Sequence, residues 1–185
     1  SIVGRIGIFG KERAILALQY ILQKKGRHLD IGAGRGDLLA ICQDMGIDSI
    51  GMDYSFSSTL ICKQKGGSII NADTRNIPFQ DNTFSLVTLL DVIEHIPKKE
   101  KIFREIARVL DRKGVVIITT PNIKSVQELL IKLSRRIHLL PYLQPYDSPI
   151  PLTAIKNLLG NEGFEIKKIK KYHYGWYYLI IALLK

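Results

Sequence analysis

Short apolar runs alternate with segments of helical periodicity over residues 27–120, and this alternation limits the chain to very few folds. The run at 115–120, VVIITT, is apolar and β-branched throughout, as expected for a parallel strand covered on both faces. Strands alternating with helices predict a doubly wound, mostly parallel α/β sheet. We predict strands at 27–31, 49–53, 68–71, 84–90 and 115–120, with helices at 37–45, about 57–65 and about 99–110.

The segments outside this alternation complete the sheet and flank it. A lead-in helix is predicted at 11–24, where Ile15, Leu18 and Leu22 recur at helical spacing. A further helix is predicted at about 125–137, before HLLPYLQPYDSPIP, whose prolines exclude regular helix and which we interpret as a lid. After a helix at 152–161, strands at 164–172 and 176–184 are joined so closely that they must be antiparallel. The sheet should therefore have seven strands and a C-terminal hairpin.

One domain is expected, because 185 residues with 46% hydrophobic content suffice for one compact core. We divide it into an N-terminal helix (1–26), a ligand-binding half (27–122), a lid region (123–162) and the hairpin (163–185). Cys42 and Cys62 form no CxxC pair, so we expect no metal and a reducing compartment. The longest apolar run, 176–184, is about half the ~20 residues of a membrane span. With no signal peptide at the start, we predict a cytoplasmic location.

The net charge of +10 has two interpretations. Excess lysine and arginine attract phosphate backbones or anionic lipid. The basic pairs are scattered along the chain, which favours an ordinary solvated surface, at 24–25, 98–99, 135–136, 167–168 and 170–171. A nucleic-acid-binding face stays open as the alternative.

The segment HLDIGAGRGDLL (28–39) places Gly32, Gly34 and Gly36 where a strand turns into a helix. Without a Cβ the backbone turns tightly and a ligand can lie directly against it, facing the amides of the following helix. Asp53 ends the next strand, 21 residues after Gly32, at the place from which a carboxylate accepts hydrogen bonds from a ribose. The alternatives are a simple turn for the glycines and a helix cap for Asp53.

Four blocks in order make the chain resemble the class I S-adenosylmethionine-dependent methyltransferases, in particular the group that includes ubiquinone-biosynthesis-type enzymes. They are LDIGAGRGDLL (29–39), IGMDYS (50–55), NADTRNIPFQDNTFSLVTLLDVIEHI (71–96) and EIARVLDRKGVVIITTPN (105–122). The resemblance implies a Rossmann-like fold, S-adenosyl-L-methionine as cofactor and methyl transfer as the activity. A nicotinamide-dependent oxidoreductase fits less well, because its G-x-G-x-x-G spacing is absent and Asp30 would repel a pyrophosphate.

The resemblance also implies the roles of individual residues. Asp73 would bind the adenine amino group, with a loop aspartate that stabilises a turn as the alternative. Asp53 would bind the ribose, and the residues that end the fourth predicted strand would lie near the transferable methyl. His95, just after that strand, is the candidate general base, with orientation of Glu94 or capping of the following helix as its alternatives. The implied cofactor-binding residues are Asp30, Gly32, Gly34, Gly36, Asp53, Tyr54, Ala72, Asp73, Leu90 and Asp91.

The acceptor is predicted to be a small molecule. The Asn/Asp-Pro-Pro-Tyr/Phe block of many amino-group methyltransferases is replaced here by LDVIEH, and neither cysteine follows a proline as in base-carbon RNA methylation. Tyr142, Tyr146 and Tyr174 are candidate acceptor contacts, with aromatic packing as their alternative. An RNA methyltransferase docking through its basic surface and a non-catalytic adenosylmethionine-binding module are the other hypotheses. The methylated atom and the oligomeric state stay open.

Overall fold

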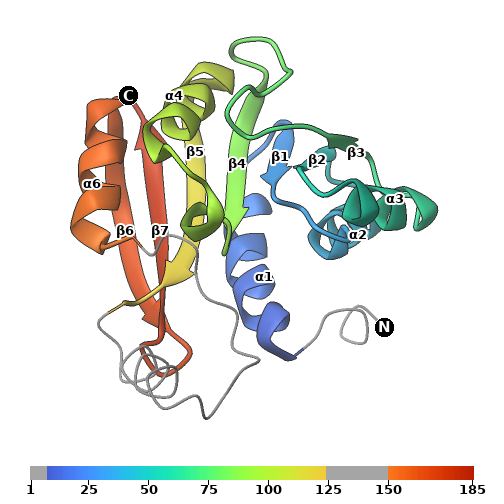
Figure 1. Cartoon of the computed structure of the whole chain (residues 1–185), viewed down its shortest axis with the longest axis horizontal. Coiled ribbons are helices and arrows are strands. Elements are labelled where there is room, and N and C mark those ends of the chain that lie inside the picture. Colours follow the sequence, from blue (N-terminus) through green and yellow to red (C-terminus); the bar gives the residue numbers. More distant parts are fainter. Residues whose placement is uncertain (1–7, 124–149) are drawn as a thin grey trace.

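A computed structural model of the chain describes residues 8–123 and 150–185 (Figure 1). The helix predicted at about 125–137, most of the proline-rich segment, Tyr142 and Tyr146 lie outside these residues. Within the described part, no helix is both long and apolar enough to cross a membrane.

Seven strands form one mixed sheet in the order β3-β2-β1-β4-β5-β7-β6, which confirms the predicted Rossmann-like architecture. The first five strands are parallel, whereas β7 runs antiparallel to both β5 and β6. Their bounds are β1 (His28–Ile31), β2 (Ser49–Asp53), β3 (Ile69–Asn71), β4 (Phe84–Leu90), β5 (Leu110–Pro121), β6 (Phe164–Tyr172) and β7 (Tyr177–Leu184). The carboxyl ends of β1, β2, β4 and β5 therefore meet at one edge of the sheet.

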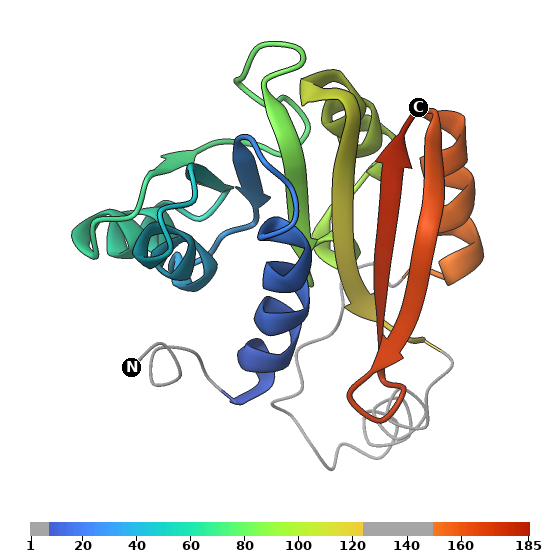
Figure 2. The ribbon, with the colours of Figure 1, turned by 180° about the vertical axis from the view of Figure 1, so that it is seen from behind.

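Helices cover both faces of this sheet. Figures 1 and 2 show α4 and α6 on one face and α1 on the other, where α2 also packs. Each face has its own hydrophobic cluster, with Ile102, Ile106 and Ile155 on the α4 and α6 side. The helices are α1 (Ile8–Ile21), α2 (Asp37–Asp44), α3 (Phe56–Gln64), α4 (Lys99–Val109) and α6 (Leu152–Asn161), with a 3-10 turn, η2 (Ile93–His95).

Helix α1 packs through a narrower face than its leucines and isoleucines suggest. Ala14, Ala17 and Ile21 are buried, whereas Ile15 is 55% and Leu22 is 56% exposed. The small alanines let the helix lie close to β4 and β5. Of the residues predicted to mark its pattern, Leu18 packs against this cluster, whereas Ile15 and Leu22 point away from the core. Strand β5 also begins earlier than predicted, because Leu110 pairs with Phe84 before a register shift.

Candidate functional site

Two cavities open at the carboxyl ends of the parallel strands, and both are lined by Gly32. The first, of about 550 Å³, holds six of the predicted residues: Gly32, Asp53, Tyr54, Asp73, Asp91 and His95. The second, of about 340 Å³, lies between α1, β1 and α2 and holds four: Asp30, Gly32, Gly34 and Leu90. The topology therefore brings most of the predicted cofactor-binding residues into one crevice.

Three predicted residues do not line either cavity. Gly36 is buried, and a Cβ there would meet the Cys62 Sγ at 2.2 Å, so this glycine allows α2 and α3 to pack closely. Ala72 lies next to the crevice, with its amide donating to the Asp53 carbonyl. Tyr174 lies at the tip of the β6–β7 hairpin and is 91% exposed.

Gly34 presents bare backbone to the second cavity. Its φ is +56°, and a Cβ built on it would have no atom within 4 Å. This contrasts with Gly32, where a Cβ would meet Val92 at 2.4 Å. The turn between β1 and α2 is therefore closed by packing at one glycine and left open to a ligand at the other.

Asp53 ties the end of β2 to the glycine turn. Its Oδ2 accepts from the Gly34 amide and its Oδ1 from the Ser55 amide, both at 2.8 Å. The cap of α3 is Ser55, whose Oγ accepts from the Ser58 amide, so Asp53 is not the helix cap considered from the sequence. Each carboxylate oxygen keeps a lone pair for a further donor in the first cavity.

Asp30 is a buried carboxyl at the floor of the second cavity. The Thr88 hydroxyl donates to its Oδ1 at 2.6 Å, and His28 Nε2 lies 2.8 Å from the same hydroxyl. Burial lowers the pKa of His28 to about 3, so the ring is neutral and its Nε2–H donates to Thr88. Burial also raises the pKa of Asp30 to about 7. The protein therefore stabilises the ionised form of Asp30 only weakly, and a cationic ligand group in the second cavity would stabilise it further.

Replacing Asp30 by asparagine should change stability in a pH-dependent way. With a folded-state pKa near 7 against an ordinary 3.8, the native protein binds this proton more tightly than the unfolded chain does, so stability falls as pH rises from about 4 to 7. Asp30→Asn should therefore unfold with a free energy on the order of 2 kcal/mol above wild type at pH 8, with the difference shrinking toward pH 4. Urea unfolding at pH 4.5, 6 and 8 measures this, with exposed Asp48→Asn as the surface control. A constant difference across pH would contradict it.

Arg13 is a residue of the crevice that the sequence pattern did not reveal. It projects from α1 into the second cavity and forms an ion pair with Asp91 at the end of β4. Asp91 has a left-handed backbone, with φ +57°, and accepts from the Thr119 hydroxyl at 2.6 Å. The pair joins residues 78 positions apart, so only the fold brings it together.

The turn after β4 carries two titratable side chains with different surroundings. His95 is exposed and lines the first cavity. Glu94 is 1% exposed; its Oε2 lies 3.5 Å from the Thr120 hydroxyl, and its Oε1 has no hydrogen-bond partner among the described residues. Burial raises the pKa of Glu94 to about 8. Of the two, only His95 lines the first cavity.

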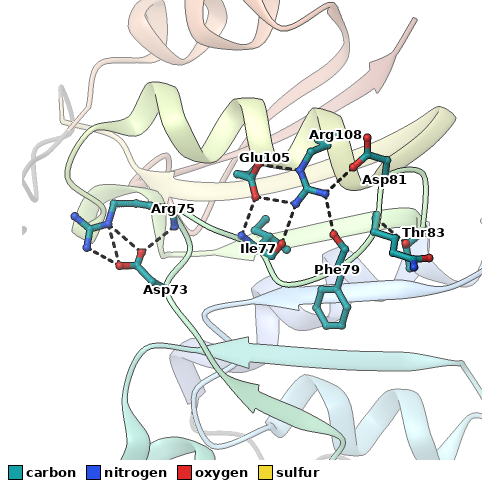
Figure 3. A network of polar contacts seen from close by, with 9 residues as sticks. Asp73, Arg75, Ile77, Phe79, Asp81, Thr83, Glu105 and Arg108 are labelled. Carbon is teal, nitrogen blue, oxygen red and sulfur yellow. Dashed lines mark hydrogen bonds and ion pairs between the residues drawn. The ribbon is translucent and has the colours of Figure 1, made fainter.

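The loop between β3 and β4 is held against α4 by a polar network (Figure 3). Arg108 donates to the carbonyls of Ile77 and Phe79, each at 2.8 Å, and pairs with Glu105 and Asp81. Glu105 in turn accepts from the Ile77 amide at 2.8 Å, and the Arg108 guanidinium lowers the pKa of Glu105. This network fixes the loop that carries the predicted adenine contact, Asp73.

A family model described as a methyltransferase domain matches residues 9–169 of the chain. The chain belongs to this methyltransferase family. The resemblance to class I S-adenosylmethionine-dependent methyltransferases is thus confirmed, and with it the assignment of the protein as an enzyme that uses this methyl donor. The residues present fit that cofactor, because a bare backbone, a strand-end carboxylate and a buried acid line two cavities that meet at Gly32.

Named relatives of the methyltransferase act on different substrates. It is 25% identical to a ubiquinone biosynthesis O-methyltransferase of Glaesserella parasuis, covering 86% of this chain and 76% of the relative. It is 29% identical to a demethylmenaquinone methyltransferase of Staphylococcus epidermidis, covering 60% of this chain and about half, 52%, of the relative. A probable tRNA methyltransferase 9B of Mus musculus is 33% identical over 92 residues, which are 48% of this chain and 20% of that protein.

Solved structures share the fold of the methyltransferase. The PH0226 protein of Pyrococcus horikoshii superimposes with a TM-score of 0.77 at 21% identity, covering 94% of this chain and 89% of that one. Magnesium protoporphyrin IX methyltransferase of Synechocystis, solved with bound S-adenosylhomocysteine, has a TM-score of 0.76 at 17% identity, covering 97% and 89%. In the part of the methyltransferase that the structure describes, no three His, Cys, Asp or Glu residues are grouped to hold a metal ion.

Proposed function

We propose that the methyltransferase transfers the methyl group to a small-molecule acceptor that carries a hydroxyl on a quinol-like ring. The observation that carries this proposal is the lining of the first cavity, where Val92, Ile96 and Pro97 provide apolar wall beside His95 and Asp91. Concave sites with mostly apolar walls and a few polar groups are typical of small-molecule pockets. Two relatives named for quinone biosynthesis support the same class.

We propose that the cofactor spans both cavities. Asp73 and Asp53 would bind the adenine amino group and the ribose hydroxyls in the first cavity, with Tyr54 and Ala72 beside them. The methionine part would cross Gly32 into the second cavity. There Asp30 would face the ammonium group of the methionine part. Arg13 would leave Asp91 and pair instead with the carboxylate of the methionine part, because charge-assisted hydrogen bonds between a guanidinium and a carboxylate are strong. Leu90 and Asp91 would lie next to the sulfonium.

Methyl transfer requires little acid–base catalysis by the protein, because S-adenosylmethionine supplies an already activated methyl group. The protein's task is to align the acceptor oxygen with the methyl and to exclude water, and such positioning supplies several kcal/mol. We propose that His95 removes the acceptor proton, since an imidazole is the side chain suited to that transfer near neutral pH. His95 lies on η2, shortly after β4, and lines the first cavity, where the acceptor is proposed to bind.

The acceptor proposal predicts methyl transfer to catechols or hydroquinones and little dependence on salt. The test measures S-adenosylhomocysteine release with phenols, catechols, sugars and bulk tRNA at 50 and 200 mM salt. We expect turnover with a ring hydroxyl, changing less than about twofold between the two salt concentrations.

The competing acceptor is RNA, which the exposed lysines of β6 and the partial tRNA methyltransferase match favour. An RNA substrate would lose affinity steeply over the same salt range, because each neutralised phosphate releases counterions. Methylation of tRNA alone, with that steep salt dependence, would overturn the small-molecule proposal.

A further inference from the structure

The carboxylate proposed to recognise adenine is already fully hydrogen-bonded by one neighbour, Arg75. Oδ1 of Asp73 accepts from the Arg75 amide at 2.8 Å and from Nε at 3.0 Å. Oδ2 accepts from the same Nε at 3.0 Å and from Nη2. A carboxylate offers about four lone-pair sites, so Arg75 leaves none clearly free for a ligand amino group. Both side chains line the first cavity.

The backbone around Asp73 cannot easily move to expose its carboxylate. On one side, the Ala72 amide and the Asn71 side chain both donate to the Asp53 carbonyl, at 3.1 and 2.9 Å. On the other side, Ile77 is held by Glu105 and Arg108 (Figure 3). A ligand that approaches Asp73 must therefore displace the Arg75 side chain rather than the loop.

The Arg75 side chain is free to be displaced. It is 44% exposed, and Asp73 is its only hydrogen-bond partner among the described residues. Exposed ion pairs contribute only about 0.2–1 kcal/mol, because water solvates the separated charges well. The guanidinium lowers the pKa of Asp73. An aspartate side chain is ionised at neutral pH without such a partner, so the carboxylate can still accept once Arg75 has moved.

We propose that Arg75 is a latch on the adenine site: it occupies the Asp73 carboxylate in the free enzyme and swings into solvent when the cofactor's adenine takes its place. The inference rests on the proposed position of adenine at Asp73. Arg75 thereby sets the affinity for adenosyl ligands in general, product included, without contacting the reacting atoms. It is a residue that competes with the ligand, so removing it should improve binding.

The test titrates S-adenosylhomocysteine, which carries no sulfonium charge, into wild type, Arg75→Lys and Arg75→Ala by calorimetry. We expect Arg75→Ala to bind tighter than wild type, by about 1.4- to fivefold, the range that follows from an exposed ion pair of about 0.2–1 kcal/mol. Arg75→Lys should be intermediate, because a lysine keeps the charge but cannot form the bidentate fork. Arg112→Ala removes an exposed arginine near the amino end of β5, away from the crevice, and controls for net charge.

A double-mutant cycle with Asp73→Ala tests whether the gain in affinity of Arg75→Ala depends on the Asp73 carboxylate. In the Asp73→Ala background, adding Arg75→Ala should leave the affinity unchanged, because no carboxylate is left to release. Equal or weaker binding by Arg75→Ala, or a gain that persists without Asp73, would overturn the latch while leaving the proposed cofactor site intact. Absence of S-adenosylhomocysteine binding by wild type would instead overturn the proposed site, and the latch with it.

Discussion

Replacing Gly34 by alanine should weaken S-adenosylhomocysteine binding at least tenfold while the protein stays folded. The new methyl group would meet no protein atom within 4 Å, so the fold bears only the left-handed strain of about 1–2 kcal/mol. It would, however, project into the second cavity, where the methionine part of the ligand is proposed to lie against bare backbone. Calorimetric titration measures the affinity, and thermal unfolding without ligand measures the fold.

Gly46 provides the matched control for this substitution. Its φ of +69° is also left-handed and a Cβ there would also meet nothing within 4 Å, but it lines neither cavity of the crevice. Gly46→Ala should therefore lose a similar amount of stability and no affinity. Equal affinities for the two alanine variants would mean that the ligand does not lie against Gly34.

Replacing Asp53 by alanine should also reduce the affinity at least tenfold, or about 1.4 kcal/mol. Two effects contribute, because Asp53 accepts from the Gly34 amide as well as facing the first cavity. The direct contribution can be separated with the 2′-deoxy analogue of S-adenosylhomocysteine. Wild type should discriminate strongly against the analogue, whereas Asp53→Ala should bind both ligands about equally.

Asp53→Asn completes this comparison. The amide can still accept from one backbone N–H but presents a donor where the second acceptor was. It should lie between wild type and alanine in affinity. Retention of full discrimination against the deoxy ligand by Asp53→Ala would show that another group recognises the ribose.

The features that the sequence predicted well are those with a local physical cause. The mostly parallel sheet follows from the alternation of strands and helices, because parallel strands need long crossover connections and the helices supply them. The glycines of the first turn and Asp53 at the end of β2 are brought to one edge by the topology alone. The division of the chain into ligand-binding, lid and hairpin segments stays a prediction.

The features that the sequence did not predict depend on packing between distant elements. Arg13 belongs to the crevice only because α1 crosses the end of β4, and nothing near it in the sequence signals that contact. The buried face of α1 includes the predicted Leu18, but it also includes alanines, which carry little hydrophobic signal although Ala17 is fully buried. The competition of Arg75 for Asp73 likewise depends on side-chain geometry rather than on a motif.

The two margins of the sheet bear on how copies of this enzyme can associate. One margin is β3, which is only three residues long, and the other is β6, where Lys167, Lys168, Lys170 and Lys171 are all exposed. Repulsion between these cations opposes the approach of an identical strand, as in other proteins that resist edge-to-edge aggregation. Self-association of the described residues should therefore use helical surfaces, and fibrillar growth by strand addition is disfavoured from both sides.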